Sequence, residues 1–158
     1  MSTASNKTPK RPTVSSEMVL AAAQELVGQQ YFPLEQTRAT KEAAAQHLAS
    51  CYCPGMGGYE LARELDDDHG WRIDSHMVDE LEVMGHMVDE QLMAAEAKWH
   101  KEHNIQPPYP VGTMIAEGEI TSIYEHSPAR YLVKTHGQAP DSETGNRRLV
   151  IKFEDAKP

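Results

Sequence analysis

The chain has 158 residues, of which 39% are hydrophobic and 25% are charged, and its formal net charge is −9. That apolar content suffices for a modest hydrophobic core and is too high for a wholly disordered chain. No signal peptide or membrane span is expected, because residues 1–15 are polar and the longest apolar stretch, residues 18–23, is far too short to cross a bilayer. Cys51 and Cys53 lie too close in sequence for a structural disulfide. We therefore expect a soluble protein of the reducing cytoplasm.

The charge divides the chain into three parts. Residues 1–15 carry +3 in a Ser-, Thr-, Pro- and Lys-rich segment, which we expect to be a disordered tail. Residues 16–104 hold 6 Lys or Arg against 17 Asp or Glu, a net charge of −11, whereas residues 105–158 hold 6 against 7. The acidic part argues against contact with a nucleic-acid backbone. It fits a solvated surface, or a face that docks onto a basic partner.

Apolar residues recur at helical spacing throughout residues 16–104. The spacing predicts helices over residues 16–30, 34–50, 59–68 and 75–103, with Gly70 ending the third. The fourth helix carries the longest apolar stripe, at steps of three or four residues: Met77, Leu81, Met84, Val88, Leu92, Ala95 and Trp99. Gly85 interrupts this helix and indicates close packing or a bend there.

Residues 105–158 change to a strand-like pattern after Pro107 and Pro108, which end the long helix. Short segments rich in Val, Ile, Tyr and Leu predict strands over residues 111–115, 119–124, 129–134 and 149–153. We therefore expect an α+β protein, with an acidic helical region over residues 16–104 and a small β-rich module over residues 105–158. The module is expected to be an antiparallel meander or a small SH3-like barrel.

Two sets of residues suggest metal binding at first sight. His47, Cys51 and Cys53 have the spacing H-x3-C-x-C, and His69 or an acid would have to complete a zinc site. The chain has no second Cys pair, so packing of Cys51 as a small apolar residue is the favoured interpretation.

The second set is a repeated His-Met-Val-Asp-Glu, which begins at His76 and again at His86. Ten residues on a helix place these two rings about 80° apart, so we expect two solvated side chains rather than one site. No motif selects a nucleophile or an acid–base pair. We expect no catalytic residue, no bound metal and no cofactor.

Two surfaces are candidates for binding a macromolecule. Val83, Met87 and Ala94 fall on one side of the long helix, away from its apolar stripe, and are the candidate contact for a partner protein. Basic residues of the β module are interleaved with Tyr124, Tyr131 and Phe153, as in small nucleic-acid-binding barrels. These basic residues are Arg130, Lys134, Arg147, Arg148 and Lys152. Seven acids in the same module weaken that pattern, and ordinary strand-edge charges are the alternative.

Four segments together carry a resemblance: GYELARELDDDHGW, IQPPYPVGT, ARYLVK and RRLVIKFEDA, which lie within residues 58–156. They resemble a group of small uncharacterised proteins encoded by bacteriophages and prophages of Gram-negative bacteria. The resemblance lies in hydrophobic and turn residues and implies no catalytic residue. It implies an accessory gene product of a phage or mobile element, made in the bacterial cytoplasm.

These features predict a non-enzymatic protein that acts by binding a host or phage protein. One alternative is an inhibitor whose acidic helices imitate nucleic acid toward a host defence protein. Another is direct nucleic-acid binding by the β module, and the last is a metal-dependent enzyme.

Overall fold

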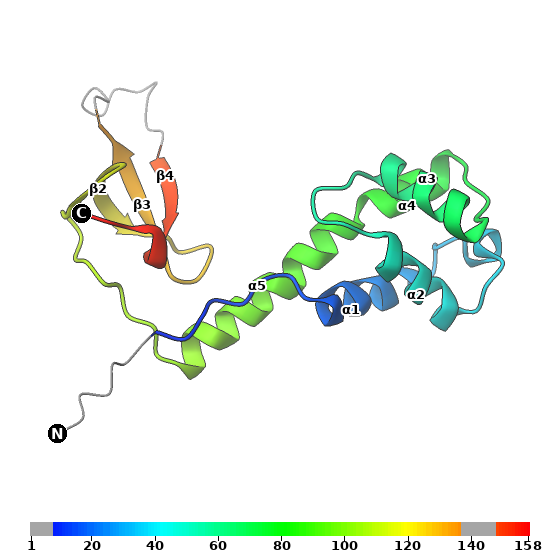
Figure 1. Ribbon diagram of the computed structural model, residues 1–158, viewed down its shortest axis with the longest axis horizontal. Helices are drawn as coiled ribbons and strands as arrows, with labels where there is room; N and C mark the ends of the chain where they lie inside the picture. Colours follow the sequence, from blue (N-terminus) through cyan, green and yellow to red (C-terminus); the bar gives the residue numbers. More distant parts are fainter. Residues whose placement is uncertain (1–7, 137–147) are drawn as a thin grey trace. The chain divides into compact units, whose positions relative to one another are not determined.

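The computed structural model describes residues 8–136 and 148–158, which form an α+β protein of helices and one antiparallel sheet (Figure 1). The predicted fold class is confirmed. The chain divides into two compact units, which we describe separately. The helical unit is Pro12–Ala94, and the sheet unit comprises Met1–Arg11 and Ala95–Pro158. Among the described residues, no helix combines the length and apolar character needed to cross a membrane.

The helical unit contains five helical elements and the first part of a sixth. These are α1 (Ser16–Val27), the 3-10 helix η1 (Leu34–Thr37), α2 (Lys41–Cys51), α3 (Gly58–His69), α4 (Ser75–Glu82) and α5 (Met84–Glu102). The sheet unit contains the rest of α5 and five short elements. These are β1 (Met114–Ile115), β2 (Gly118–Ile123), β3 (Arg130–Thr135), β4 (Arg148–Lys152) and the 3-10 helix η2 (Phe153–Asp155).

The single helix predicted over residues 34–50 is wrong, because the chain makes a turn in its middle. Arg38 has a φ of 57°, the left-handed conformation, which no α-helix can continue through. A new helix then starts, and the Thr40 hydroxyl caps it by accepting a hydrogen bond from the Ala43 N–H at 3.2 Å. The result is the short η1 followed by α2.

The third predicted helix is confirmed as α3, and Gly70 ends it. Gly70 has a φ of 66° and donates its N–H to the Asp66 carbonyl, as a left-handed C-terminal cap does. At its other end, α3 crosses α4 very closely. The Gly58 N–H donates to Glu82 Oε2 at 2.6 Å, so a carboxylate from α4 caps α3.

The long helix predicted over residues 75–103 is present as α4 and α5, which span 28 residues when Val83 between them is included. The interruption falls at Val83, not at Gly85. The N-cap of α4 is Asp74, whose Oδ1 accepts a hydrogen bond from the Met77 N–H at 2.9 Å.

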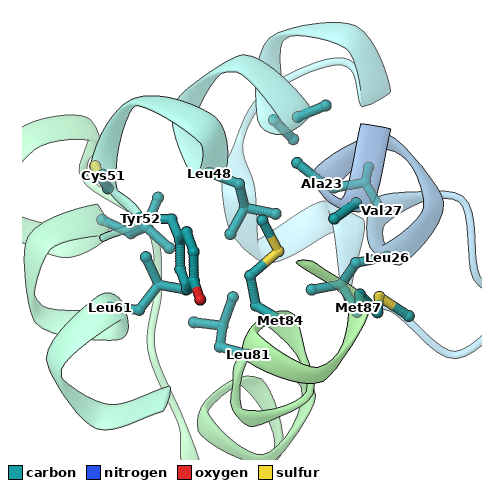
Figure 2. Close-up of a cluster of buried hydrophobic side chains, with 14 of the residues drawn as sticks. Ala23, Leu26, Val27, Leu48, Cys51, Tyr52, Leu61, Leu81, Met84 and Met87 are labelled. Atoms are coloured by element: carbon teal, nitrogen blue, oxygen red, sulfur yellow. The ribbon is translucent and has the colours of Figure 1, made fainter. Parts of the chain in front are cut away.

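Side chains from every helix of the helical unit converge on one apolar core (Figure 2). Leu48, Leu61 and Leu81 are each at most 1% exposed and come from α2, α3 and α4. Burying a side chain of this size contributes about 1.5–3 kcal/mol. The other labelled members of the core are Ala23, Leu26, Val27, Cys51, Tyr52, Met84 and Met87.

The sheet is an antiparallel meander in the order β1-β2-β3-β4. Of the two predicted forms the meander is therefore correct, and the sheet that the described strands form is open rather than a closed barrel. One face is apolar, with Ile120, Tyr131 and Val133 fully buried. These side chains pack with Trp99 of α5 and Phe153 of η2 in a second core.

Candidate functional site

The helical unit is strongly acidic. Residues 12–94 contain 15 Asp or Glu and 4 Lys or Arg, a net charge of −11, whereas the sequence of the sheet unit sums to +2. In the structure, 14 of these 15 acids are exposed. Within this fully described unit, no Lys or Arg lies within 4.0 Å of a carboxylate. The carboxylates therefore create a negative potential that no ion pair with Lys or Arg offsets.

The solvent face of α3 combines this charge with an aromatic ring. Tyr59 is 66% exposed. Glu60, Glu64 and Asp67 follow at helical spacing and are exposed as well. Leu61 and Leu65, on the opposite face of the same helix, are buried in the core and hold α3 in place.

The three residues predicted as a partner contact do not form one exposed face. Val83 is 40% exposed and Ala94 is exposed, but Met87 is 7% exposed and belongs to the core (Figure 2). The expectation failed because the buried stripe is wider than predicted. Beyond Val83, α5 buries Met84, Met87 and Val88 together.

His47 and His69 lie side by side, on α2 and α3. Their rings stack with centroids 3.9 Å apart and an angle of 10° between the planes. Trp71 donates its indole N–H to His47 Nδ1 at 3.1 Å, and Ser50 Oγ lies 3.4 Å from His69 Nε2. Burial lowers the pKa of His47 below its usual value, and the nearby His69 lowers it further.

The two cysteines of the H-x3-C-x-C spacing do not join these two rings. Cys51 is buried and directs its Sγ toward Asp68 Oδ2 at 3.9 Å, whereas Cys53 is exposed. Burial raises the pKa of the Cys51 thiol, which disfavours the thiolate that a metal needs. In the part of the chain that the structure describes, no three His, Cys, Asp or Glu side chains form a possible metal site.

The repeated histidines lie apart and on the surface. His86 is paired with Glu90 at 3.0 Å, and His76 lies 4.0 Å from Glu80. Their side chains are 76% and 53% exposed. Two separate i, i+4 pairs on a helix surface explain the repeat without a shared ligand.

Strand alternation puts four of the five basic residues proposed for nucleic-acid contact on one side of the sheet, although the Arg130 side chain is only 17% exposed and pairs with the buried Glu96. In register, Arg130 faces Lys152 and Lys134 faces Arg148, with the apolar pair Leu132 and Val150 between them. The fifth, Arg147, lies outside the described residues. The charges of this face are partly compensated, since Arg130 pairs with Glu96 and Lys134 and Arg148 also interact within the chain.

The aromatic rings expected to interleave with these cations mostly lie elsewhere. Tyr131 is fully buried and Phe153 is 6% exposed, with ring centroids 4.5 Å apart in the core. They are on the inner side of the sheet, so they offer no stacking surface for bases. Nucleic-acid binding by this face stays a prediction that rests on charge alone.

One buried cluster was absent from the sequence-based expectations. Arg11, in the segment expected to be a tail, is 8% exposed, and its guanidinium lies 4.9 Å from the centre of the Trp99 ring. It contacts Glu96, which is 2% exposed, and Glu154. Glu96 itself binds Arg130 through both oxygens, at 2.8 and 3.3 Å.

The sequence does carry a signal for part of this cluster. Glu96 stands four residues after Leu92 and three before Trp99, on the same side of the helix as the apolar stripe. An acid at such a position needs a buried cationic partner. Nothing local identifies Arg11 as that partner, because 85 residues separate the two.

Burial by itself would raise the pKa of Glu154. The hydrogen bond from Arg11 opposes this, and together with the Glu154 backbone N–H and the charges of Arg11 and Lys152 it leaves the pKa below its usual value. The carboxylate is therefore held in its charged form.

Comparison of the chain with protein-family models, with curated proteins and with solved structures gave no match.

Proposed function

We propose that the chain is a non-enzymatic accessory protein that binds a basic surface of another protein through its acidic helical unit. The observation that carries this proposal is the exposure of 14 of the 15 carboxylates of the unit, with no Lys or Arg ion pair among them. Uncompensated charge of one sign speeds association with a partner of the opposite sign and orients the encounter.

The solvent face of α3 is the centre of the proposed contact. Tyrosine is among the residues that contribute most to protein interfaces, and Tyr59 is 66% exposed with no core role. Glu60, Glu64 and Asp67 lie beside it and supply the charge. This face replaces the one formed by Val83, Met87 and Ala94, since Met87 is occupied in the core.

The proposed setting is the cytoplasm of a Gram-negative bacterium, where the chain would be the product of a phage or mobile element. The support for this setting is the resemblance carried by residues 58–71, 105–113, 129–134 and 147–156. The partner would then be a host or phage protein.

A triple substitution on α3 tests the contact. Glu60→Gln, Glu64→Gln and Asp67→Asn together remove three exposed charges without touching the core. We expect the tagged variant to capture at least about tenfold less of the principal partner from Gram-negative host lysate. Loss of three charges from such an interface should weaken the binding free energy by more than about 1.4 kcal/mol, which corresponds to a tenfold loss of affinity.

The matched control removes the same amount of charge from the sheet unit. Glu102→Gln, Glu119→Gln and Glu125→Gln are three exposed positions outside the helical unit, and this variant should capture the partner as the wild type does. Equal capture by both variants would show that the α3 face is not the contact.

Imitation of nucleic acid is the sharper form of the same proposal, and it is favoured by the excess of 15 Asp or Glu over 4 Lys or Arg in the helical unit, with no Lys or Arg ion pair among them. It requires a partner that itself binds DNA. Duplex DNA added to the capture experiment should then release the partner, and capture that is insensitive to DNA and to salt would exclude this form.

A further inference from the structure

Residues 8–11, which we call the N-terminal strap, lie against the sheet unit as a bound peptide would. The strap has no helical or strand structure, and Pro9 and Pro12 keep the chain around Arg11 extended. Among the described residues, the strap has one hydrogen-bonded backbone group, the Pro9 carbonyl, which accepts from Trp99 Nε1 at 3.2 Å. Thr8, Pro9 and Lys10 are exposed, so a single side chain, that of Arg11, anchors the strap.

The cavity that receives this side chain, the Arg11 pocket, is built from distant parts of the chain. Glu96 and Trp99 come from α5, the carbonyls of Pro128 and Ala129 precede β3, and Glu154 lies in η2. Every one of these groups is at least 85 residues away from Arg11 in sequence. The pocket therefore belongs to the folded sheet unit, and the strap is its occupant.

The pocket matches the hydrogen-bonding pattern of a guanidinium. Glu154 accepts from Nε at 2.6 Å and from Nη2 at 3.1 Å, a bidentate pair. Nη2 also donates to the Ala129 carbonyl at 2.7 Å. Nη1 donates to the Pro128 carbonyl at 3.0 Å and to Glu96 at 3.4 Å. Five donors meet five acceptors, and the Trp99 ring covers one side.

The charges of the pocket require a cation. Glu96 and Glu154 contribute two negative charges and Arg130 one positive charge, which leaves −1 before Arg11 is added. The Glu96 side chain is only 3% exposed and lies between the guanidinium groups of Arg130 and Arg11, so these groups rather than water compensate it, whereas the Glu154 side chain is 46% exposed. A lysine would restore the charge but has three donors on a tetrahedral nitrogen, and it cannot form the planar bidentate pair with Glu154.

We propose that the Arg11 pocket is a binding site for an arginine presented on an extended peptide, and that the N-terminal strap occupies it in exchange with such a peptide from a partner protein. The strap has the high effective concentration of a tethered ligand, so it fills the pocket in the free chain. A partner peptide with an arginine followed directly by a proline, as in the strap, would displace the strap. This proposal is independent of the acidic surface of α3.

The experiment supplies the strap in trans to the full chain. Arg11→Ala empties the pocket, and a synthetic peptide of residues 6–14, NKTPKRPTV, is the probe. A second peptide with alanine in place of its arginine is the peptide control. Lys10→Ala is the protein control, because it removes the same charge from the adjacent exposed residue and leaves Arg11 in place.

The readout is amide hydrogen exchange over residues 129–133, beside the pocket, with about 1 mM peptide, a concentration comparable to that of a tethered segment. We expect the arginine peptide to slow exchange at least about tenfold in the Arg11→Ala chain, and the alanine peptide to have no effect. In the Lys10→Ala chain neither peptide should change exchange, because Arg11 still fills the pocket.

This readout holds whether or not the Arg11→Ala sheet unit stays folded, since binding to an unstable unit restores protection by mass action. Equal effects of the two peptides in the Arg11→Ala chain, or no effect of either, would overturn the proposal. Equal protection of the Lys10→Ala and Arg11→Ala chains by the arginine peptide would also overturn it, because the peptide would then bind elsewhere.

Discussion

His47 supports the core of the helical unit through a single ring nitrogen. Its Nδ1 accepts the indole N–H of Trp71, which is 1% exposed and has no access to water as a substitute partner. The bond requires the neutral ring with its proton on Nε2, because a protonated ring has two donors and no acceptor. A positive charge on His47 would also lie next to the stacked ring of His69, since the two ring centroids are 3.9 Å apart.

We therefore predict that acid destabilises the helical unit through His47. Its pKa is lowered by folding, chiefly by burial and then by His69, so the unfolded chain binds more protons than the folded one below about pH 6.5. The contribution of neutral His47 to the free energy of unfolding is complete above that pH. It is lost as the pH falls through the pKa of His47 in the folded chain. Urea unfolding followed by circular dichroism between about pH 5 and pH 8 measures this loss.

His47→Asn isolates the contribution. The Asn amide oxygen occupies nearly the position of Nδ1 and does not titrate, so the acid-dependent loss of stability should be smaller in this variant than in the wild type. His86→Asn is the matched control, because the His86 side chain is 76% exposed on the surface of α5 and should leave the loss unchanged. An unaltered pH profile in His47→Asn would contradict the assignment.

The crossing of α3 and α4 leaves no room for a side chain at Gly58. A Cβ at Gly58 would lie 2.6 Å from the Val78 carbonyl oxygen and 2.8 Å from the Glu82 nitrogen, both of them backbone atoms of α4. Backbone atoms cannot rotate away as a side chain can. The absence of a side chain at Gly58 thus sets the distance between the two helices, and it also lets Glu82 reach the Gly58 N–H.

Gly58→Ala should accordingly cost about 1–3 kcal/mol of unfolding free energy, the usual cost of an added methyl group in a filled core. Gly57→Ala is the matched control, since a Cβ there would meet only Glu82 Oε2, at an ordinary 3.9 Å. Urea denaturation of both variants gives the comparison. A Gly58→Ala chain as stable as the Gly57→Ala chain would mean that the helices separate without cost.

At the scale of elements, local sequence patterns predicted much of the fold. The apolar residues at helical spacing in α3 and the glycine that ends it, Gly70, are local signals. Segments rich in β-branched residues likewise predict the strands. The break at Arg38 was missed because residues 35–42 contain no Gly or Pro to mark it, and a positive φ at an arginine has no local sequence signal. The Arg11 pocket was missed because its groups converge only through the tertiary fold. An isolated arginine in a polar segment has no periodicity to reveal its burial.

At the scale of the whole molecule, the charge is segregated between the two units. The sequence of the helical unit sums to −11 and that of the sheet unit to +2. Self-repulsion among like charges opposes compactness, and mobile ions screen it. The Debye length falls from about 30 Å at 0.01 M salt to about 10 Å at 0.1 M, which spans the distances across a small unit.

We therefore expect the thermal midpoint of the helical unit to rise between about 0.01 M and 0.1 M NaCl, by about 2–8 °C for each kcal/mol of repulsion removed. Circular dichroism at the helical wavelength follows the transition. The variant with Glu60→Gln, Glu64→Gln and Asp67→Asn provides the comparison, because it carries three fewer negative charges and should gain less from salt. A midpoint independent of salt in the wild type would show that the exposed carboxylates do not oppose folding.

The two tryptophans of the chain are divided between the units, with Trp71 in the helical core and Trp99 under the guanidinium of Arg11. Each unit therefore contains a single tryptophan. In a Trp71→Phe chain all tryptophan emission comes from Trp99. The fluorescence of its indole depends on the positive charge of the cation that lies over the ring. Departure of the strap would then change the colour or intensity of that emission, so occupancy of the pocket can be followed optically without an attached dye.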